Sequence, residues 1–127
     1  MRSYERFAYV FKMNSYPENA RFYEYVLLLL GRRKRIRVTG ASMLPGLKDG
    51  DELFLNPHAF TSNHPEEGDI VVAWHPRQAD LKIIKRVSMV LDNGCWLVGD
   101  NSAESSDSSQ YGIFPFKRIV GKVTSRC

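Results

Sequence analysis

The chain has 127 residues, enough for one domain to bury its own hydrophobic core without disulfides or metals. Hydrophobic residues make up 43% of the chain and charged residues 25%, close to the values of ordinary globular proteins. A net charge of +4 is too small to indicate nucleic-acid binding by itself. The two cysteines, Cys95 and Cys127, exclude a disulfide-stapled domain, so nothing requires an oxidising compartment.

The first predicted element is a helix over residues 17–30. Pro17 suits a first helical position, and Gly31 suits the end of a helix. The apolar run Phe22–Leu30 is much shorter than the roughly 20 residues that a membrane span needs, so we expect no transmembrane span. Residues 26–30 are apolar on all sides. They must be covered by the protein's own sheet, by a membrane surface or by another subunit.

A basic cluster follows this helix. Residues 32–37, Arg-Arg-Lys-Arg-Ile-Arg, hold five of the 18 basic residues. One interpretation is a solvated loop between two elements. The other is contact with anionic lipid or an acidic partner, because each basic residue near an anionic membrane contributes about 1 kcal/mol. We expect a cytoplasmic chain. Residues 22–37 are either exposed to solvent or in peripheral contact with a membrane.

From residue 35 the pattern changes to short strands separated by turns. Apolar and β-branched runs predict strands at residues 35–39, 52–55, 69–74, 81–90, 95–98 and 119–125. Asp92-Asn93-Gly94 predicts a hairpin, and polar loops are expected at 56–68 and 99–112. This spacing is typical of a mainly β, barrel-like or coiled-sheet domain. We expect a helical extension over residues 1–34 and the main domain over 35–127.

Two residues far apart in the sequence could supply a nucleophile and its base. Ser42 lies in the turn from Gly40 to Gly46, whose backbone N–H groups could face a developing oxyanion. Lys85 shares one face of a predicted strand with Ile83 and Val87. If that face is buried, the pKa of the amine falls toward the range in which lysine acts as a base. The alternatives are an ordinary turn serine and an exposed lysine on a strand edge.

The other polar residues are less informative. The Ser-rich segment 99–109 could hold such a pair in place, or it could be a flexible connector. His58, His64 and His75 show no metal-ligand spacing, and no glycine-rich phosphate loop is present, so we expect no metal and no cofactor. Nothing in the pattern supports a triad of Ser42, His75 and an aspartate.

Four segments, taken in order, resemble the boxes of type I signal peptidases. They are Ser42-Met43-Leu44-Pro45, Gly68-Asp69-Ile70-Val71-Val72, Lys85-Arg86-Val87, and Gly99-Asp100-Asn101 with Ser105-Ser106-Asp107-Ser108. The resemblance covers roughly residues 36–125. It implies a coiled β-sheet of the signal-peptidase and LexA-like kind, with a Ser/Lys dyad that cleaves peptide bonds.

The resemblance also implies a role for each matched residue. Ser42 corresponds to the nucleophile and Lys85 to its general base. The residues that would support this dyad are Ser105, Asp107, Gly99, Asp100 and Asn101. The residues that would face the substrate or the oxyanion are Gly40, Ala41, Met43 and Pro45.

Two positions depart from the pattern of that family. Ser109 stands where the family usually has an arginine that pairs with the aspartate, here Asp107. Gly40 stands where some members have a serine that completes the oxyanion hole. The backbone N–H of Ser42, with other backbone donors or water, would act instead.

Within this superfamily the chain looks most like the nickel-type superoxide dismutase maturation proteases, which are compact relatives that remove an N-terminal propeptide. We therefore expect a serine endopeptidase whose partner is a protein with an extended N-terminal propeptide, and no nucleic acid. The alternatives are a type I signal peptidase acting on secretory precursors, a self-cleaving repressor-like protein, and a non-enzymatic basic β-barrel that binds nucleic acid.

Overall fold

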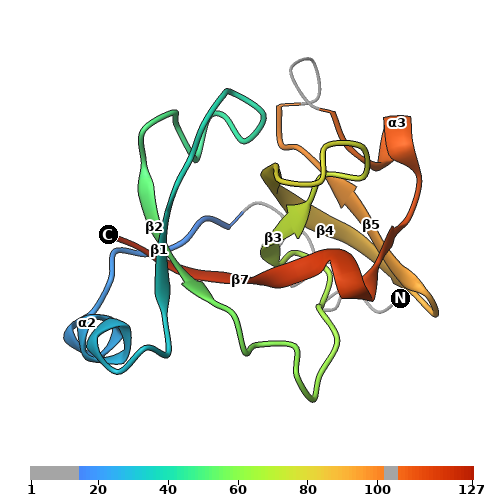
Figure 1. Cartoon of the computed structure of the whole chain (residues 1–127). Coiled ribbons are helices and arrows are strands. Elements are labelled where there is room, and N and C mark those ends of the chain that lie inside the picture. The colour runs from blue at the N-terminus through green and yellow to red at the C-terminus, as the bar shows by residue number, and fades with distance from the viewer. Residues whose placement is uncertain (1–14, 102–105) are drawn as a thin grey trace, which may run out of the picture.

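A computed structural model describes residues 15–101 and 106–127 of the chain. Seven strands form one antiparallel sheet in the order β1-β2-β7-β3-β4-β5-β6, which curls into a half-barrel (Figure 1). The strands are β1 (Lys34–Arg37), β2 (Glu52–Asn56), β3 (Ile70–Trp74), β4 (Lys82–Leu91), β5 (Gly94–Val98), β6 (Phe114–Pro115) and β7 (Ile119–Arg126). The described helices are α2 (Phe22–Leu29), α3 (Ser108–Tyr111) and the 3-10 turn η2 (Phe116–Arg118). The mainly β fold with one helix near the N-terminus is thereby confirmed.

The core consists of two hydrophobic clusters separated by the sheet. Val72 of β3 packs in one cluster, with Leu53 among its members, while Val71 and Ala73 pack in the other, with Val87. Successive side chains of a strand point to opposite faces, so β3 is covered on both sides. This explains why the sequence of β3 is a continuous apolar run instead of an alternating one.

Helix α2 begins later than the sequence predicts. It starts at Phe22 instead of Pro17, and the residues before it are extended. The N–H of Ala20 donates to the carbonyl of Arg126 at 2.6 Å, and the N–H of Arg126 donates to the carbonyl of Glu18 at 2.8 Å. These bonds to β7 outweigh the local helix signal, so the predicted helix over 17–30 was too long at its start.

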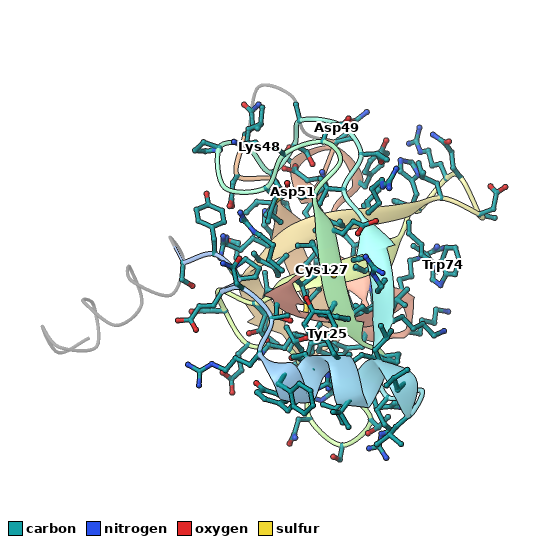
Figure 2. All side chains as sticks on the ribbon, turned by 90° about the vertical axis from the view of Figure 1, so that its left-hand side faces the viewer. Tyr25, Lys48, Asp49, Asp51, Trp74 and Cys127 are labelled. Atoms are coloured by element: carbon teal, nitrogen blue, oxygen red, sulfur yellow. The ribbon has the colours of Figure 1, made fainter. Side chains whose placement is uncertain are left out.

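Helix α2 lies against the end of the sheet formed by β1 and β2 (Figure 2). The ring of Tyr25 meets the buried ring of Phe54 edge-on, with 5.1 Å between the ring centroids. Among the described residues, none of the helices has the length and apolar character to cross a membrane.

The segment 99–112, predicted to be a loop from its polar composition, contains the short helix α3. Asp107 caps α3 by accepting a hydrogen bond from the N–H of Ser109 at 3.0 Å, and Gly112 follows the helix with a φ of +78°. The loop prediction was therefore wrong at residues 108–111. The division of the chain into a helical extension (1–34) and a main domain (35–127) stays a prediction.

Candidate active site

Ser42 lies in the turn that joins β1 to β2. Met43, inside this turn, and Leu47, just after it, are fully buried in the core and anchor the turn. The N–H of Gly40 donates to Oδ1 of Asp49 at 2.8 Å, and Gly40 has a φ of +84°, which a glycine adopts without strain. The turn is thus held at both ends, with Ser42 half-buried between them.

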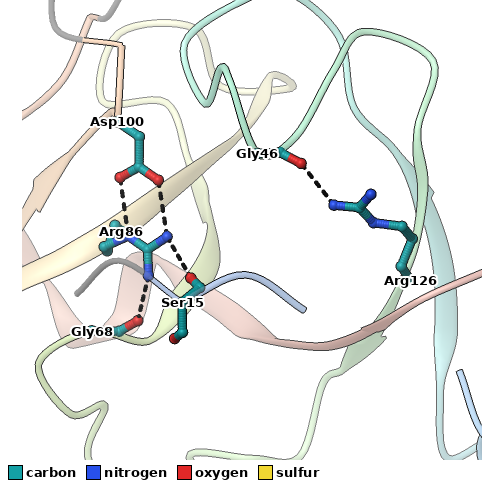
Figure 3. A network of polar contacts seen from close by, with 6 residues as sticks. All are labelled: Ser15, Gly46, Gly68, Arg86, Asp100 and Arg126. Atoms are coloured by element: carbon teal, nitrogen blue, oxygen red, sulfur yellow. Dashed lines mark hydrogen bonds and ion pairs between the residues drawn. The ribbon is translucent and has the colours of Figure 1, made fainter. Parts of the chain in front are cut away.

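Two more contacts hold this turn from other parts of the chain. The N–H of Asn101 donates to the carbonyl of Ser42 at 2.8 Å, and its Nδ2 donates to the carbonyl of Ala41 at 3.0 Å. Nη2 of Arg126 donates to the carbonyl of Gly46 at 2.7 Å (Figure 3). Asn101 therefore binds the backbone carbonyls of Ser42 and Ala41. Neither of these two hydrogen bonds involves the hydroxyl of Ser42.

Lys85 lies in the middle of β4, opposite Val71 of β3. Its side chain is 4% exposed, so the alternative of an exposed lysine on a strand edge is wrong. Burial lowers the pKa of Lys85 from its ordinary value of 10.5, and the negative charge of Asp107 opposes this shift. A lower pKa raises the neutral fraction of the amine, which is the form that can accept a proton.

One cavity of about 520 Å³ has both Ser42 and Lys85 in its wall. Its other walls come from Ile36 and Arg37 of β1 and from the hairpin that joins β3 to β4. A hydroxyl and a buried amine thus line one concave site that also has apolar walls. Such a site can hold a peptide segment and expose it to a nucleophile.

Arg86, the neighbour of Lys85, ties the site to the rest of the fold (Figure 3). Its side chain is 1% exposed, and its Nε and Nη2 donate to the two carboxylate oxygens of Asp100 at 3.0 and 2.9 Å. It also donates to the carbonyls of Gly68 at 3.0 Å and Ser15 at 2.9 Å. Because Asp100 precedes Asn101, this bidentate pair connects β4 to the contact with the serine turn.

Asp107 is bound by backbone and hydroxyl groups, and Ser109 stands where the related family usually has an arginine. Its side chain is 5% exposed and accepts the N–H of Gly99 at 3.0 Å. The other carboxylate oxygen accepts both the N–H of Ser109 at 3.0 Å and its hydroxyl at 2.7 Å. Ser109 therefore binds Asp107 directly, although it carries no charge. Ser105, which is also predicted to support the dyad, lies outside the described residues.

The remaining predicted residues divide into two groups. Gly40, Ala41 and Met43 line the cavity, whereas Pro45 is exposed and is not in its wall. Gly99 and Asp100 are also absent from the wall and act through the contacts described above. Ser106, which follows the residues left undescribed, does line the cavity.

The sequence did not predict that His75 and Tyr111 line the cavity, as the structure shows. Nδ1 of His75 accepts the N–H groups of Arg77 and Gln78 at 3.0 and 3.1 Å, and its ring packs edge-on against Tyr111 with centroids 5.0 Å apart. That nitrogen is therefore bound by the backbone, and the triad alternative gains no support. The position of His75 directly after a buried strand was the signal that could have placed it here.

The described residues contain no group of three or more His, Cys, Asp or Glu side chains that could hold a metal ion. The polar side chains that line the cavity include the hydroxyl of Ser42, the amine of Lys85, the imidazole of His75 and the phenol of Tyr111.

Comparison with known proteins identifies the family. Residues 15–124 match the family described as Peptidase S24-like. The chain is 35% identical over 110 residues to mitochondrial inner membrane protease subunit 2 of Danio rerio, covering 69% of this chain and 60% of that protein. It is 31% identical over 108 residues to mitochondrial inner membrane protease subunit 1 of Schizosaccharomyces pombe, covering 69% of each.

The match to the Danio rerio protein thus spans less than two thirds of that relative's length. These relatives agree with the predicted signal-peptidase-like superfamily. Because the family match extends over most of the sequence, the chain belongs to the Peptidase S24-like family.

Proposed function

We propose that the chain is a serine endopeptidase in which Ser42 is the nucleophile and Lys85 is its general base. The observation that carries this proposal is the presence of both side chains in the wall of one cavity, with Lys85 only 4% exposed. Burial removes most of the water that would favour the charged amine. Membership of a peptidase family supports the same chemistry.

The reaction has two steps. Neutral Lys85 takes the proton from the hydroxyl of Ser42 as Oγ attacks the peptide carbonyl, and the ammonium then gives that proton to the leaving amine. The C–N bond breaks and the acyl group stays on Oγ as an ester. Lys85 next takes a proton from water, whose oxygen attacks the ester. The acid is released, and the proton returns to Oγ of Ser42.

The backbone positions the substrate and the developing negative charge. The Ser42 turn is held by Asn101, Asp49 and Arg126, so its N–H groups do not need to reorganise when the oxyanion forms. Strand β1 is the edge of the sheet and contributes Ile36 and Arg37 to the cavity. An extended peptide would pair along that edge as an additional strand.

The substrate that we propose is an N-terminal propeptide, with the precursor of a nickel-type superoxide dismutase as the first candidate. This choice rests on the resemblance of the sequence to the proteases that mature such dismutases. The relatives named above are membrane proteases, which makes precursors with an N-terminal targeting segment the competing substrate class.

A cleavage assay separates these possibilities. The purified chain is mixed with a propeptide-bearing nickel dismutase and, in parallel, with a secretory precursor, and mass spectrometry locates the new N-terminus. We expect one defined cleavage in the dismutase precursor, lost in Ser42→Ala, whereas Ser88→Ala, a half-buried serine outside the cavity wall, stays active. Cleavage by folded Ser42→Ala would contradict the assignment of the nucleophile. Cleavage of the secretory precursor alone would contradict the assignment of the substrate.

A further inference from the structure

Helix α2 exposes its apolar side chains and buries its single charged one. Phe22 is 83% exposed and Leu29 is 87% exposed, whereas Glu24 is 3% exposed and pairs with Nε of Arg33 at 2.8 Å. A helix on the surface of a globular protein normally has the opposite arrangement. The solvent-exposed side of α2 is therefore mainly apolar.

The exposed residues of this helix form one surface, which we call the α2 patch. It consists of Phe22, Tyr23, Val26, Leu29 and the C-cap residue Leu30; Tyr25, which is 44% exposed, borders it. Phe22, Val26 and Leu29 are spaced four and three residues apart, so they share one face of the helix. Phe22 and Leu29 are almost fully exposed, whereas the neighbouring ring of Tyr25 packs on Phe54 of β2. The α2 patch is therefore an exposed apolar surface on one helix.

The chain places positive charge directly beside the α2 patch. Arg32 and Lys34 follow α2 and are exposed, and no acidic side chain among the described residues lies within salt-bridge distance of either one. The neighbouring Arg35 and Arg37 share a single carboxylate, that of Glu52. An excess of cationic groups therefore borders the apolar surface.

We propose that the α2 patch and the adjoining cations dock on a membrane surface that contains anionic lipids. A helix of eight residues is about 12 Å long, which suits a helix lying in the plane of the interface. Apolar side chains enter the acyl region while Arg32 and Lys34 meet the lipid phosphates. A second copy of the chain could cover the apolar side chains of the α2 patch. It could not pair with the adjoining cations, because the same region of the second copy is also basic.

Docking of this kind brings the cavity close to the membrane. Strand β1 begins at Lys34, in the basic border, and ends at Arg37, in the cavity wall. The three intervening steps span about 10 Å, so the nearest part of the cavity wall lies about 10 Å along β1 from the basic border. The docking itself does not depend on the proposed protease function and is tested without any substrate.

The first test is flotation of the full chain with lipid vesicles. We expect the chain to float with phosphatidylcholine vesicles that contain about one third phosphatidylglycerol, and to float much less with phosphatidylcholine alone. Raising the salt concentration should weaken binding to the anionic vesicles, because exposed charges are screened. Equal flotation with both vesicle types, or flotation with neither, would overturn the proposal.

The second test removes apolar area from the patch. The double variant Phe22→Ser with Leu29→Ser should bind anionic vesicles at least tenfold more weakly, given the apolar area that is lost. The matched control is Met89→Ser with Ile113→Ser, because these side chains are exposed apolar residues elsewhere, 47% and 39% exposed. The control should bind like the unchanged chain. Circular dichroism confirms that both variants are folded.

The third test removes charge. Arg32→Gln with Lys34→Gln should weaken binding roughly 30-fold. Lys48→Gln with Lys117→Gln removes the same number of charges from exposed positions outside the patch and should change binding far less. Equal effects of the two pairs would show attraction by net charge alone, which would overturn docking through the patch.

Two further results would also overturn the proposal. Flotation that is unchanged in the α2 variants would place the lipid contact elsewhere on the chain. A dimer in solution that the α2 variants dissociate, without any vesicle binding, would identify a second copy as the occupant of the patch.

Discussion

Replacement of Asp100 by asparagine tests whether the buried ion pair holds the site together. Asp100 is 14% exposed and accepts two charge-assisted hydrogen bonds from Arg86, which is 1% exposed. Asparagine keeps one acceptor oxygen but turns an N–H₂ group toward the guanidinium. The positive charge of Arg86 then stays buried beside two backbone carbonyls.

The size of the effect follows from these contacts. A hydrogen bond to a charged group contributes about 1.5–3 kcal/mol, and breaking a buried pair costs about 3–5 kcal/mol. Because one acceptor remains, we expect Asp100→Asn to lower the free energy of unfolding by about 2–4 kcal/mol. For a chain of this length the fall in Tm is roughly 10 °C.

Differential scanning calorimetry measures this change directly. Glu52→Gln is the matched control, because it makes the same substitution in a carboxylate that binds Arg35 and Arg37 at the exposed surface. Solvent screens that pair, so its shift in Tm should be clearly smaller. A shift for Asp100→Asn no larger than that of Glu52→Gln would show that the buried pair does not hold the site together.

Three further predictions concern Lys85 and Asp107. Cleavage should rise with pH and reach half its maximum at a pH below 10.5, because only the neutral amine of Lys85 accepts a proton and burial lowers its pKa. A half-maximum at 10.5 or above would argue against a buried base. The pKa of Lys85 is lower in the folded chain than in the unfolded chain, so the free energy of unfolding should rise with pH between these two pKa values. Denaturant titrations should show that Lys85→Met removes this rise. Ser109→Ala removes the 2.7 Å bond to Asp107 and should cost about 1 kcal/mol in the same titrations, whereas Ser109→Thr, which keeps the hydroxyl, should cost less.

Most of the sheet could be predicted from local patterns. Asp92-Asn93-Gly94 predicted the hairpin, and the structure pairs Leu91 with Gly94 across it. Strand β3 was predicted from its apolar run alone. These features depend on neighbouring residues in the sequence, which is why a single chain reveals them.

The features that sequence reasoning missed depend on distant residues. The start of α2 is set by hydrogen bonds from Arg126, more than a hundred residues later in the sequence. Alternation along β4 predicts burial of either Lys85 or Arg86, yet both are buried because elements cover both faces of the strand. The pairing of Arg86 with Asp100 likewise appears only when β4 and β5 lie side by side.

The proposed mechanism requires that the hydroxyl of Ser42 is acylated during peptide cleavage, with Lys85 as the base. The most direct measurement is an acid quench during turnover of a propeptide substrate, followed by tandem mass spectrometry of the digested protein. We expect an acyl adduct on Ser42 in the unchanged chain and none in folded Lys85→Met. Peptide cleavage without any adduct on Ser42, or undiminished cleavage by Lys85→Met, would rule out this mechanism.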